Sequence, residues 1–263
     1  MLSPQEVVSE GSDVVVYIDG RRKWIVRVVK GGVFGSDRGY IKYDNVIGQT
    51  LGSEIKLSTG FSAYLLKPLL IDYLEKGFRR QTQVLYPKDM GLMLILLGIG
   101  PGSKVLESGI GSGFMTSVIA NVVRPSGHVY AYEVREDFAK IAMENLARLG
   151  LDKYVTVKIR DIREGVDERN LDAAVIDMPN PWEALDPIHS ALKPSAPITF
   201  FLPTVSQVER LLNAIQEHGG FTDLRCFELL LREFHLVPGA IRPRTQMIGH
   251  TGYIFFARKV IMR

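Results

Sequence analysis

The sequence contains a single cysteine and no long apolar run, and both absences narrow the class of protein. Cys226 alone cannot form an internal disulfide or a cysteine-rich metal site. The longest apolar run, residues 92–99, is far shorter than the roughly 18 residues of a membrane span. The first residues also lack a basic start followed by an apolar segment, which is the pattern of a secretory signal. We therefore expect a cytoplasmic protein with no membrane segment and no metal site.

The mildly basic composition leaves the choice of partner open. A formal net charge of +3 allows a polyanionic partner without requiring one, since many basic proteins bind none. Two interpretations of Cys226 also stay open, a buried apolar side chain in a strand or an intermolecular bridge. At 263 residues, the chain is long enough for one sizeable α/β domain and a smaller second domain.

A small β-domain is predicted over residues 1–60, followed by a helical segment over residues 61–78. Residues 14–18 and 24–29 are rich in β-branched and aromatic side chains, and an Asp-Gly turn dipeptide lies between them. This arrangement predicts a hairpin. Glycines punctuate the following residues and separate further short strands.

A change of period marks the start of a second domain, predicted over residues 79–263. Short apolar runs typical of strands alternate there with helical patterns, which predicts an α/β fold with a parallel sheet and helices on both faces. A capping-box pattern at residues 206–209 predicts a helix that ends at Gly219. The predicted strands are residues 105–106, 128–132, 155–159, 173–176 and 198–202, with two late strands at 224–231 and 252–257.

A glycine-rich turn follows the first of these strands. Gly109, Gly111 and Gly113 allow the backbone to approach a ligand, because no Cβ stands in the way. A dinucleotide fingerprint needs a further glycine where Phe114 stands, and it leaves the loop free for a pyrophosphate. Here the acid Glu107 precedes the loop, and its charge repels a pyrophosphate while it suits a sulfonium and an amino group. The pattern therefore favours S-adenosylmethionine over a dinucleotide.

Acidic residues also end the next two predicted strands. Glu133 follows Gly109 by the spacing at which a carboxylate accepts both ribose hydroxyls of a nucleotide-like ligand. Asp161 ends the third strand, where it could accept a hydrogen bond from an adenine amino group. Each acid alone could instead cap the helix that follows its strand. Three acids at three successive strand ends around one glycine loop favour the ligand interpretation.

The fourth strand leads into the catalytic candidate, Asp177. The loop after it is stiffened by two prolines and contains Trp182, which could stack on or wall off an extruded base. The alternative is that Asp177 caps a helix beginning at Pro181 and that Trp182 belongs to the core.

Four segments of the sequence, taken together, resemble the motifs of the tRNA (adenine-N1)-methyltransferase family that modifies position 58 of the T loop. The likeness covers roughly residues 60–258 and is to the archaeal and bacterial single-subunit members. The Tyr-Pro-Lys-Asp and His-Thr segments are far more specific than the glycine loop. The four segments are residues 79–89, 107–113, 177–182 and 242–251.

The resemblance implies a Rossmann-like class I S-adenosylmethionine-dependent methyltransferase domain with a seven-stranded sheet, preceded by a small N-terminal β-domain. It further implies a homotetramer and a tRNA substrate. It leaves open whether the neighbouring position 57 is methylated as well. By motif, Asp177 and Tyr86 are the catalytic candidates, and Tyr86 borders the pocket of the target base. The cofactor-binding residues that it implies, together with those argued above, are Gln83, Leu85, Glu107, Gly109, Gly111, Ser112, Gly113, Phe114, Met115, Glu133, Asp161 and Asp177.

Adenine N1 carries no proton, so methyl transfer to it needs no base beforehand, but positive charge grows on the ring. A carboxylate that accepts a hydrogen bond from the exocyclic N6 would orient the base and stabilise that charge, and this is the role expected of Asp177. Trp182, Arg242 and His250 are the substrate-binding candidates. Arg242 and His250 could lie around the active-site mouth or contact tRNA phosphates, or both could be satisfied structurally by backbone carbonyls.

Three other functions compete with this interpretation. A methyltransferase that acts on protein or a small molecule would use the same loop and acids, and only the 177–182 and His250-Thr251 segments speak against it. A non-catalytic tRNA-binding subunit would be expected to have lost the cofactor motif, which is intact here. A dinucleotide oxidoreductase fails on the spacing of the loop.

Overall fold

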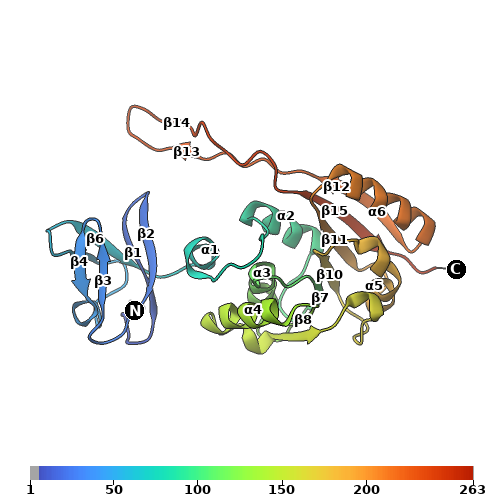
Figure 1. Cartoon of the computed structure of the whole chain (residues 1–263), viewed down its shortest axis with the longest axis horizontal. Coiled ribbons are helices and arrows are strands. Elements are labelled where there is room, and N and C mark those ends of the chain that lie inside the picture. Colours follow the sequence, from blue (N-terminus) through green and yellow to red (C-terminus); the bar gives the residue numbers. More distant parts are fainter. Residues whose placement is uncertain (1–5, 263) are drawn as a thin grey trace, which may run out of the picture. The chain divides into compact units, whose positions relative to one another are not determined.

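The computed structural model describes residues 6–262 and divides into two compact units, Met1–Phe78 and Arg79–Arg263. Figure 1 shows the elements of each unit along the chain. Each unit has its own sheet and its own buried side chains, and each is described by itself.

The N-terminal unit is built on a four-stranded antiparallel sheet with the order β2-β1-β6-β5. Its core forms where β-branched side chains of the first strand meet aromatic and aliphatic side chains of its neighbours, among them Val14, Val16 and Phe34. Trp24 packs edge-on against Phe34 at 5.3 Å between ring centroids. The elements are β1 (Asp13–Asp19), β2 (Arg22–Arg27), β5 (Glu54–Lys56) and β6 (Ser62–Leu66), with a separate pair β3 (Val33–Ser36) and β4 (Gly39–Lys42) and a 3-10 turn Tyr43–Asn45.

The helix predicted over residues 61–78 is wrong in its first part. β6 (Ser62–Leu66) is a strand that pairs antiparallel with β1, and Ala63 and Leu65 are buried on alternate positions. The burial therefore has the period of two that a strand requires, not that of a helix. Helical structure is confined to α1 (Leu70–Asp72) and the π-helical turn Tyr73–Gly77.

The second unit contains a seven-stranded sheet with the order β12-β15-β11-β10-β7-β8-β9. The strands from β9 to β11 run parallel, and β15 runs antiparallel between β11 and β12. This sheet and the small β unit before it confirm the predicted fold class. The strands are β7 (Lys104–Ser108), β8 (His128–Glu133), β9 (Val155–Ile159), β10 (Ala173–Ile176), β11 (Pro197–Leu202), β12 (Phe221–Phe227) and β15 (Tyr253–Lys259).

Helices cover both faces of this sheet, with α2, α3 and α4 on the side opposite to α5 and α6 (Figure 1). The main core cluster joins Leu106, Ile176 and Phe200 of the central strands to Ile188 of α5 and Leu211 of α6. The helices are α2 (Pro87–Leu97), α3 (Phe114–Val123), α4 (Glu136–Arg148), α5 (Leu185–Ala191) and α6 (Val205–His218), with 3-10 turns Asp152–Tyr154, Ile162–Glu164 and Pro181–Ala184.

The helix expected after residue 206 begins two residues earlier, at Val205, and uses a different cap. Thr204, in an extended conformation, is the N-cap of α6, and its side chain accepts a hydrogen bond from the Gln207 backbone N–H. The Gln207 side chain in turn accepts the N–H of Thr204, which completes the capping box. The predicted stop at Gly219 is confirmed, because this residue takes the left-handed conformation that ends the helix.

Cys226 lies in a strand, as expected, but its side chain is exposed. The interpretation of a buried cysteine is therefore wrong. The physical reason is that β12 is an edge strand of the sheet, and most of its side chains face away from the core.

A hairpin arm, residues 228–251, connects β12 to β15 and extends beyond the sheet (Figure 1). Its two short strands, β13 (Phe234–His235) and β14 (Arg242–Pro243), pair antiparallel. The arm exposes the large apolar side chains of Leu230, Leu231, Phe234, Leu236, Val237, Ile241, Met247 and Ile248.

Across residues 6–262, no helix combines the length and apolar character that a bilayer crossing needs.

Candidate cofactor and target site

The carboxyl ends of β7, β8 and β10 lie side by side, and they bring three acids to one edge of the sheet. Glu107 lies within β7, Glu133 ends β8, and Asp177 directly follows β10. The parallel register aligns these ends, because Ile176 is paired with Ser108 and Ser108 with Tyr132. The structure therefore gathers the predicted acids and the glycine loop in the position where open α/β sheets bind ligands.

Two of the three loop glycines are required by contacts with the protein itself. A Cβ on Gly109 would lie 1.8 Å from the Asp177 carbonyl oxygen, and one on Gly113 would lie 3.0 Å from Cα of Ala142 in α4. Both glycines have a positive φ. At Gly111 the nearest atom is the side-chain oxygen of Thr82, at 3.0 Å. The interpretation that these glycines make room for a ligand thus misses a second role, since they also let the loop pack tightly against its own neighbours.

Glu107 is an acid without sufficient hydrogen-bond partners. The residue is 1% exposed, and its Oε2 atom is buried with no hydrogen-bond partner among residues 6–262. Burial, together with the negative charges of Asp177 and Glu133, raises the pKa of the Glu107 carboxyl to about 8, although the nearby Thr116 hydroxyl acts in the opposite direction. A buried acceptor with a free oxygen suits a cationic or N–H donor group of a ligand.

Asp177 is half-buried, and burial together with the charge of Glu133 raises the pKa of its carboxyl to about 7. Its backbone N–H is held by the Ser108 carbonyl at 2.8 Å, but its carboxylate makes no hydrogen bond found among residues 6–262. The N-cap of the 3-10 turn Pro181–Ala184 is Asn180, with no side-chain cap. The alternative in which Asp177 caps that helix is therefore wrong.

Glu133 and Asp161 differ from these two acids because both are already hydrogen-bonded. Glu133 accepts the backbone N–H groups of Val134 at 2.9 Å, Arg135 at 3.0 Å and Gly111 at 3.2 Å. Asp161 caps the 3-10 turn Ile162–Glu164 and accepts both the N–H and the guanidinium of Arg163. That guanidinium holds the pKa of Asp161 below its ordinary value.

The segment before α2 lies on the glycine loop and is fastened to it by polar contacts. The Ser112 hydroxyl lies 3.1 Å from the Gln81 backbone nitrogen and 3.0 Å from the Thr82 hydroxyl. Asn145, buried in α4, donates to the carbonyl oxygens of both Ser112 and Arg79 at 2.9 Å.

Sequence reasoning missed Asn145 and Thr82. A signal for Asn145 was present, because it is a polar residue on the same side of α4 as the apolar residues Ala142 and Leu146. Thr82 lies within the 79–89 segment that carries the family resemblance, but nothing singles it out there, because its role depends on the fold of a loop.

The other predicted cofactor residues are spread between the interior and the surface. Leu85 is buried, as are Phe114 and Met115 in the first turn of α3. Gln83 is exposed, and its side chain accepts a hydrogen bond from Arg80 at 2.8 Å. Tyr86 is half-buried and forms the N-cap of α2.

Trp182 packs against the main core cluster, as the core alternative expects. The Arg210 guanidinium lies 4.4 Å from the centroid of its ring. Its indole N–H is buried without a hydrogen-bond partner among the described side chains and backbone. A base that stacks on Trp182 would have to use surface that neither the core nor Arg210 covers.

The structure separates the two substrate candidates of the arm. His250, at the base of the arm, bonds the Pro203 carbonyl at 2.9 Å and the Glu228 carboxylate at 2.7 Å. These partners raise the pKa of His250. Arg242 lies in β14 and is exposed. The structural alternative therefore accounts for His250, whereas it does not account for Arg242.

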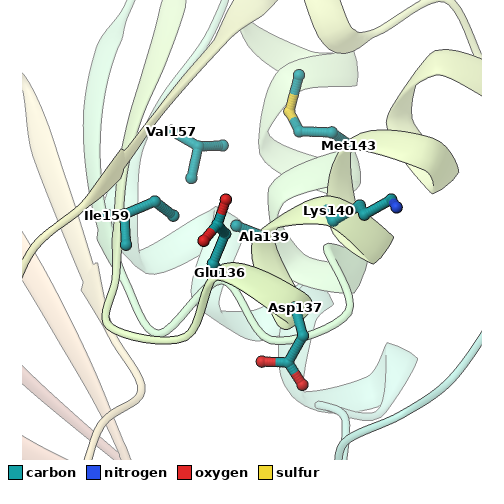
Figure 2. A pocket seen from close by; sticks show the side chains of 7 residues that line it. All are labelled: Glu136, Asp137, Ala139, Lys140, Met143, Val157 and Ile159. Atoms are coloured by element: carbon teal, nitrogen blue, oxygen red, sulfur yellow. The ribbon is translucent and has the colours of Figure 1, made fainter.

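A hollow of about 510 Å³ is lined by residues of α4 and β9. Figure 2 shows Ala139, Met143, Val157 and Ile159 around it, together with charged side chains of α4. It contains neither Glu107 nor Asp177, and we assign it no role.

The residues at the sheet edge fit S-adenosylmethionine. The unpartnered Glu107 oxygen suits the cationic end of that molecule, and the glycine turn brings backbone close to the same place.

Comparison with known proteins agrees with this chemistry. Residues 64–238 match the family model described as tRNA methyltransferase complex GCD14 subunit. A tRNA (adenine(57)-N(1)/adenine(58)-N(1))-methyltransferase TrmI from Methanocaldococcus jannaschii is 35% identical over 251 residues, with 86% of this chain and 87% of the relative covered.

Two crystal structures are similar over nearly the whole chain. A SAM-dependent O-methyltransferase from Thermotoga maritima has a TM-score of 0.92 at 36% identity, covering 98% of this chain and 96% of its own. The tRNA (m1A58) methyltransferase TrmI from Aquifex aeolicus has a TM-score of 0.87 at 31% identity, covering 98% and 100%. The edge of the sheet, the family match and these relatives lead to one conclusion: the chain belongs to the GCD14 tRNA methyltransferase family.

Proposed function

We propose that this protein transfers a methyl group from S-adenosylmethionine to N1 of adenosine 58 in the T loop of tRNA. The observation that carries the proposal is the pair of carboxylates Glu107 and Asp177, held without sufficient partners beside the glycine loop. Relatives named as tRNA adenine-N1 methyltransferases support the substrate. Since the Methanocaldococcus relative is named for positions 57 and 58, position 57 is a second target to be tested.

On the cofactor side, Glu107 would accept the cationic amino-acid end and Glu133 the ribose hydroxyls. S-adenosylmethionine, when bound, supplies an electrophilic methyl group. Positive charge near Glu107 and Asp177 lowers the pKa of both carboxyls, because it favours their ionised forms. Asp161 would meet the adenine only after its contact with Arg163 loosens, since that guanidinium occupies its oxygens.

The remaining cofactor contacts come from the glycine turn and the segment over it. Backbone would contribute more than side chains here, because several of these residues are buried or engaged within the protein. The proposed set comprises Gln83, Leu85, Gly109, Gly111, Ser112, Gly113, Phe114 and Met115.

On the target side, Asp177 would accept a hydrogen bond from adenine N6. This contact orients the base and stabilises the positive charge that grows on the ring as N1 is methylated. Asp177 suits this role because its carboxylate is free of partners in the described structure. Tyr86 and Trp182 would border the base.

Binding of the tRNA backbone is the role proposed for Arg242 and His250. Arg242 is exposed on the arm, where a guanidinium can form a bidentate pair with a phosphate. His250 would contribute in its protonated form, which its Glu228 and Pro203 partners favour. Contacts of this kind release counterions, so removal of Arg242 should reduce the salt dependence of tRNA binding.

The exposed apolar side chains of the arm support assembly into the proposed homotetramer, because such residues are normally covered by a partner. The cytoplasm is the proposed place of action, where a tRNA substrate is available.

The test is incubation of unmodified tRNA transcript with labelled S-adenosylmethionine, followed by digestion to nucleosides. The expected product is labelled 1-methyladenosine. A second candidate function is O-methyl transfer, which the similarity to the Thermotoga O-methyltransferase favours. Label in a ribose-methylated nucleoside, or no label in tRNA adenosine, would overturn the proposal.

A further inference from the structure

A buried polar cluster joins the two most specific segments of the sequence. The Lys88 ammonium lies 2.8 Å from one Asp89 oxygen and donates to the Thr251 hydroxyl at 2.6 Å. That hydroxyl donates to the other Asp89 oxygen at 2.9 Å. The three side chains therefore form a closed ring of hydrogen bonds, called here the Lys88–Asp89–Thr251 cluster.

The burial of this cluster argues against a role in stability alone. The Asp89 side chain is fully buried, and that of Lys88 is 8% exposed. Removing two charges from water is costly, and apolar residues of similar volume often stabilise a core at least as well. A ring of directional hydrogen bonds, by contrast, fixes the relative position of the two segments that carry it.

On the α2 side, the cluster is coupled to Tyr86. The Tyr86 carbonyl accepts the backbone N–H groups of Asp89 and Met90, both at 3.0 Å. Tyr86 is also the N-cap of α2. A shift of Asp89 would therefore also displace Tyr86, because the Asp89 backbone N–H bonds the Tyr86 carbonyl.

On the sheet side, the cluster is coupled to the strand beside Asp177. Thr251 follows His250, which bonds the Pro203 carbonyl just after β11. β11 pairs with β10, whose end carries Asp177. β7 and β8, which carry the cofactor candidates, lie on the other side of β10. The cluster thus connects Tyr86 to β11. This strand lies beside β10 on the side opposite to β7 and the cofactor loop.

We propose that Lys88, Asp89 and Thr251 are positioning residues that hold Tyr86 in place beside the target adenosine. This inference rests on the proposed function. It assigns the cluster to the orientation of the base and not to the binding of the cofactor. Loss of one member should therefore slow methyl transfer while cofactor affinity stays unchanged.

The test compares Thr251→Val, which keeps the shape but removes the hydroxyl, with Thr251→Ser, which restores it. For each protein, kcat and KM for a tRNA transcript, the affinity for S-adenosylmethionine by calorimetry, and Tm are measured. We expect Thr251→Val to lower kcat by about 10- to 100-fold, because small misplacement of reacting groups has effects of this size. Cofactor affinity should stay within about twofold, and Thr251→Ser should recover most of the kcat.

Two results would overturn the inference: normal kcat in Thr251→Val, or a parallel loss of cofactor affinity, which indicates general loosening. Asp89→Asn is the second variant, should Thr251→Val not fold, and the same split between kcat and affinity is expected. Failure of the proposed function is seen separately, in the unaltered protein. If that protein binds S-adenosylmethionine but leaves tRNA adenosine unmethylated, no target is present for Tyr86 and the positioning role falls with it.

Discussion

The acids at the centre of the sheet edge differ from those toward the β9 side. Among residues 6–262, one oxygen of Glu107 and the carboxylate of Asp177 have no hydrogen-bond partner, and the pKa of both carboxyls is raised. Glu133 and Asp161, on β8 and after β9, are held by N–H groups of the protein itself. Acidic side chains with and without hydrogen-bond partners therefore occur at the ends of neighbouring strands.

This difference indicates that the two pairs of acids have different roles. An acid that is fully hydrogen-bonded is oriented before a ligand arrives, whereas a buried acid without partners has an unfavourable charge that a cationic or N–H donor ligand relieves. The central pair should therefore dominate the energetics of catalysis and cofactor binding. The outer pair should make smaller contributions.

The largest effect should come from Gly109→Ala, which forces the glycine turn away from the backbone of Asp177. Its Cβ would lie 1.8 Å from the Asp177 carbonyl oxygen, a backbone atom that cannot move aside alone. We expect a loss of about 3 kcal/mol or more in the free energy of unfolding. Gly111→Ala is the matched control, with a cost of about 1–2 kcal/mol, because its φ is positive but its neighbour is a side chain. Equal denaturant midpoints for both variants would contradict the close contact.

Asp177→Ala should lower kcat by about 10²- to 10³-fold, because it removes the group that stabilises charge on the target base. Cofactor affinity should fall much less. Glu209→Gln, an exposed acid of α6, is the control and should leave kcat unchanged. Near-normal turnover in Asp177→Ala, with cofactor affinity kept, would remove Asp177 from the mechanism.

Glu107→Gln should weaken S-adenosylmethionine binding by about 10- to 100-fold, the usual range for a hydrogen bond to a charged group. In the unaltered protein, ionisation of Glu107 should strengthen binding as the pH rises toward 8, by up to about tenfold per pH unit. Calorimetric titrations at several pH values measure both effects. A pH dependence that persists in Glu107→Gln would assign it to another group.

The same carboxyl should make the cofactor-free protein less stable as the pH rises. Its folded pKa of about 8 lies above the ordinary 4.5, so the folded state binds more protons between these values. Unfolding free energy therefore falls through this window, and Glu107→Gln should flatten the fall. Denaturant unfolding at pH 5 and pH 8 measures the difference.

The smallest effect is expected at the outer acids. Arg163→Ala frees Asp161 from its guanidinium and should strengthen cofactor binding by about two- to fivefold, since exposed ion pairs are weak. Glu183→Gln removes only the other partner of Arg163 and should leave affinity unchanged. Weaker binding in Arg163→Ala would show that Arg163 supports the site.

Much of the second unit could be predicted because its pattern is local. Short apolar runs predict the strand that ends in Glu133 and the strand that precedes Asp177. Turn residues predict the turn at Gly109. The strand β6 does not follow from local pattern, because its partner β1 is distant in sequence.

The contacts within the site needed three-dimensional information. Asn145 and Thr251 meet their partners across large sequence separations, which no spacing rule encodes. The arm was expected to be a loop carrying Arg242 and His250, and only the structure shows that His250 is engaged at its base.

The central claim is that the methyl group reaches adenosine N1 beside Asp177. Primer extension on tRNA treated with the protein and S-adenosylmethionine tests it most directly, because methylation of N1 blocks base pairing and stops the polymerase. The account predicts a stop at position 58 that disappears when adenosine 58 is replaced by guanosine and is strongly reduced with Asp177→Ala. Read-through at every T-loop adenosine with the unaltered, cofactor-binding protein would contradict it.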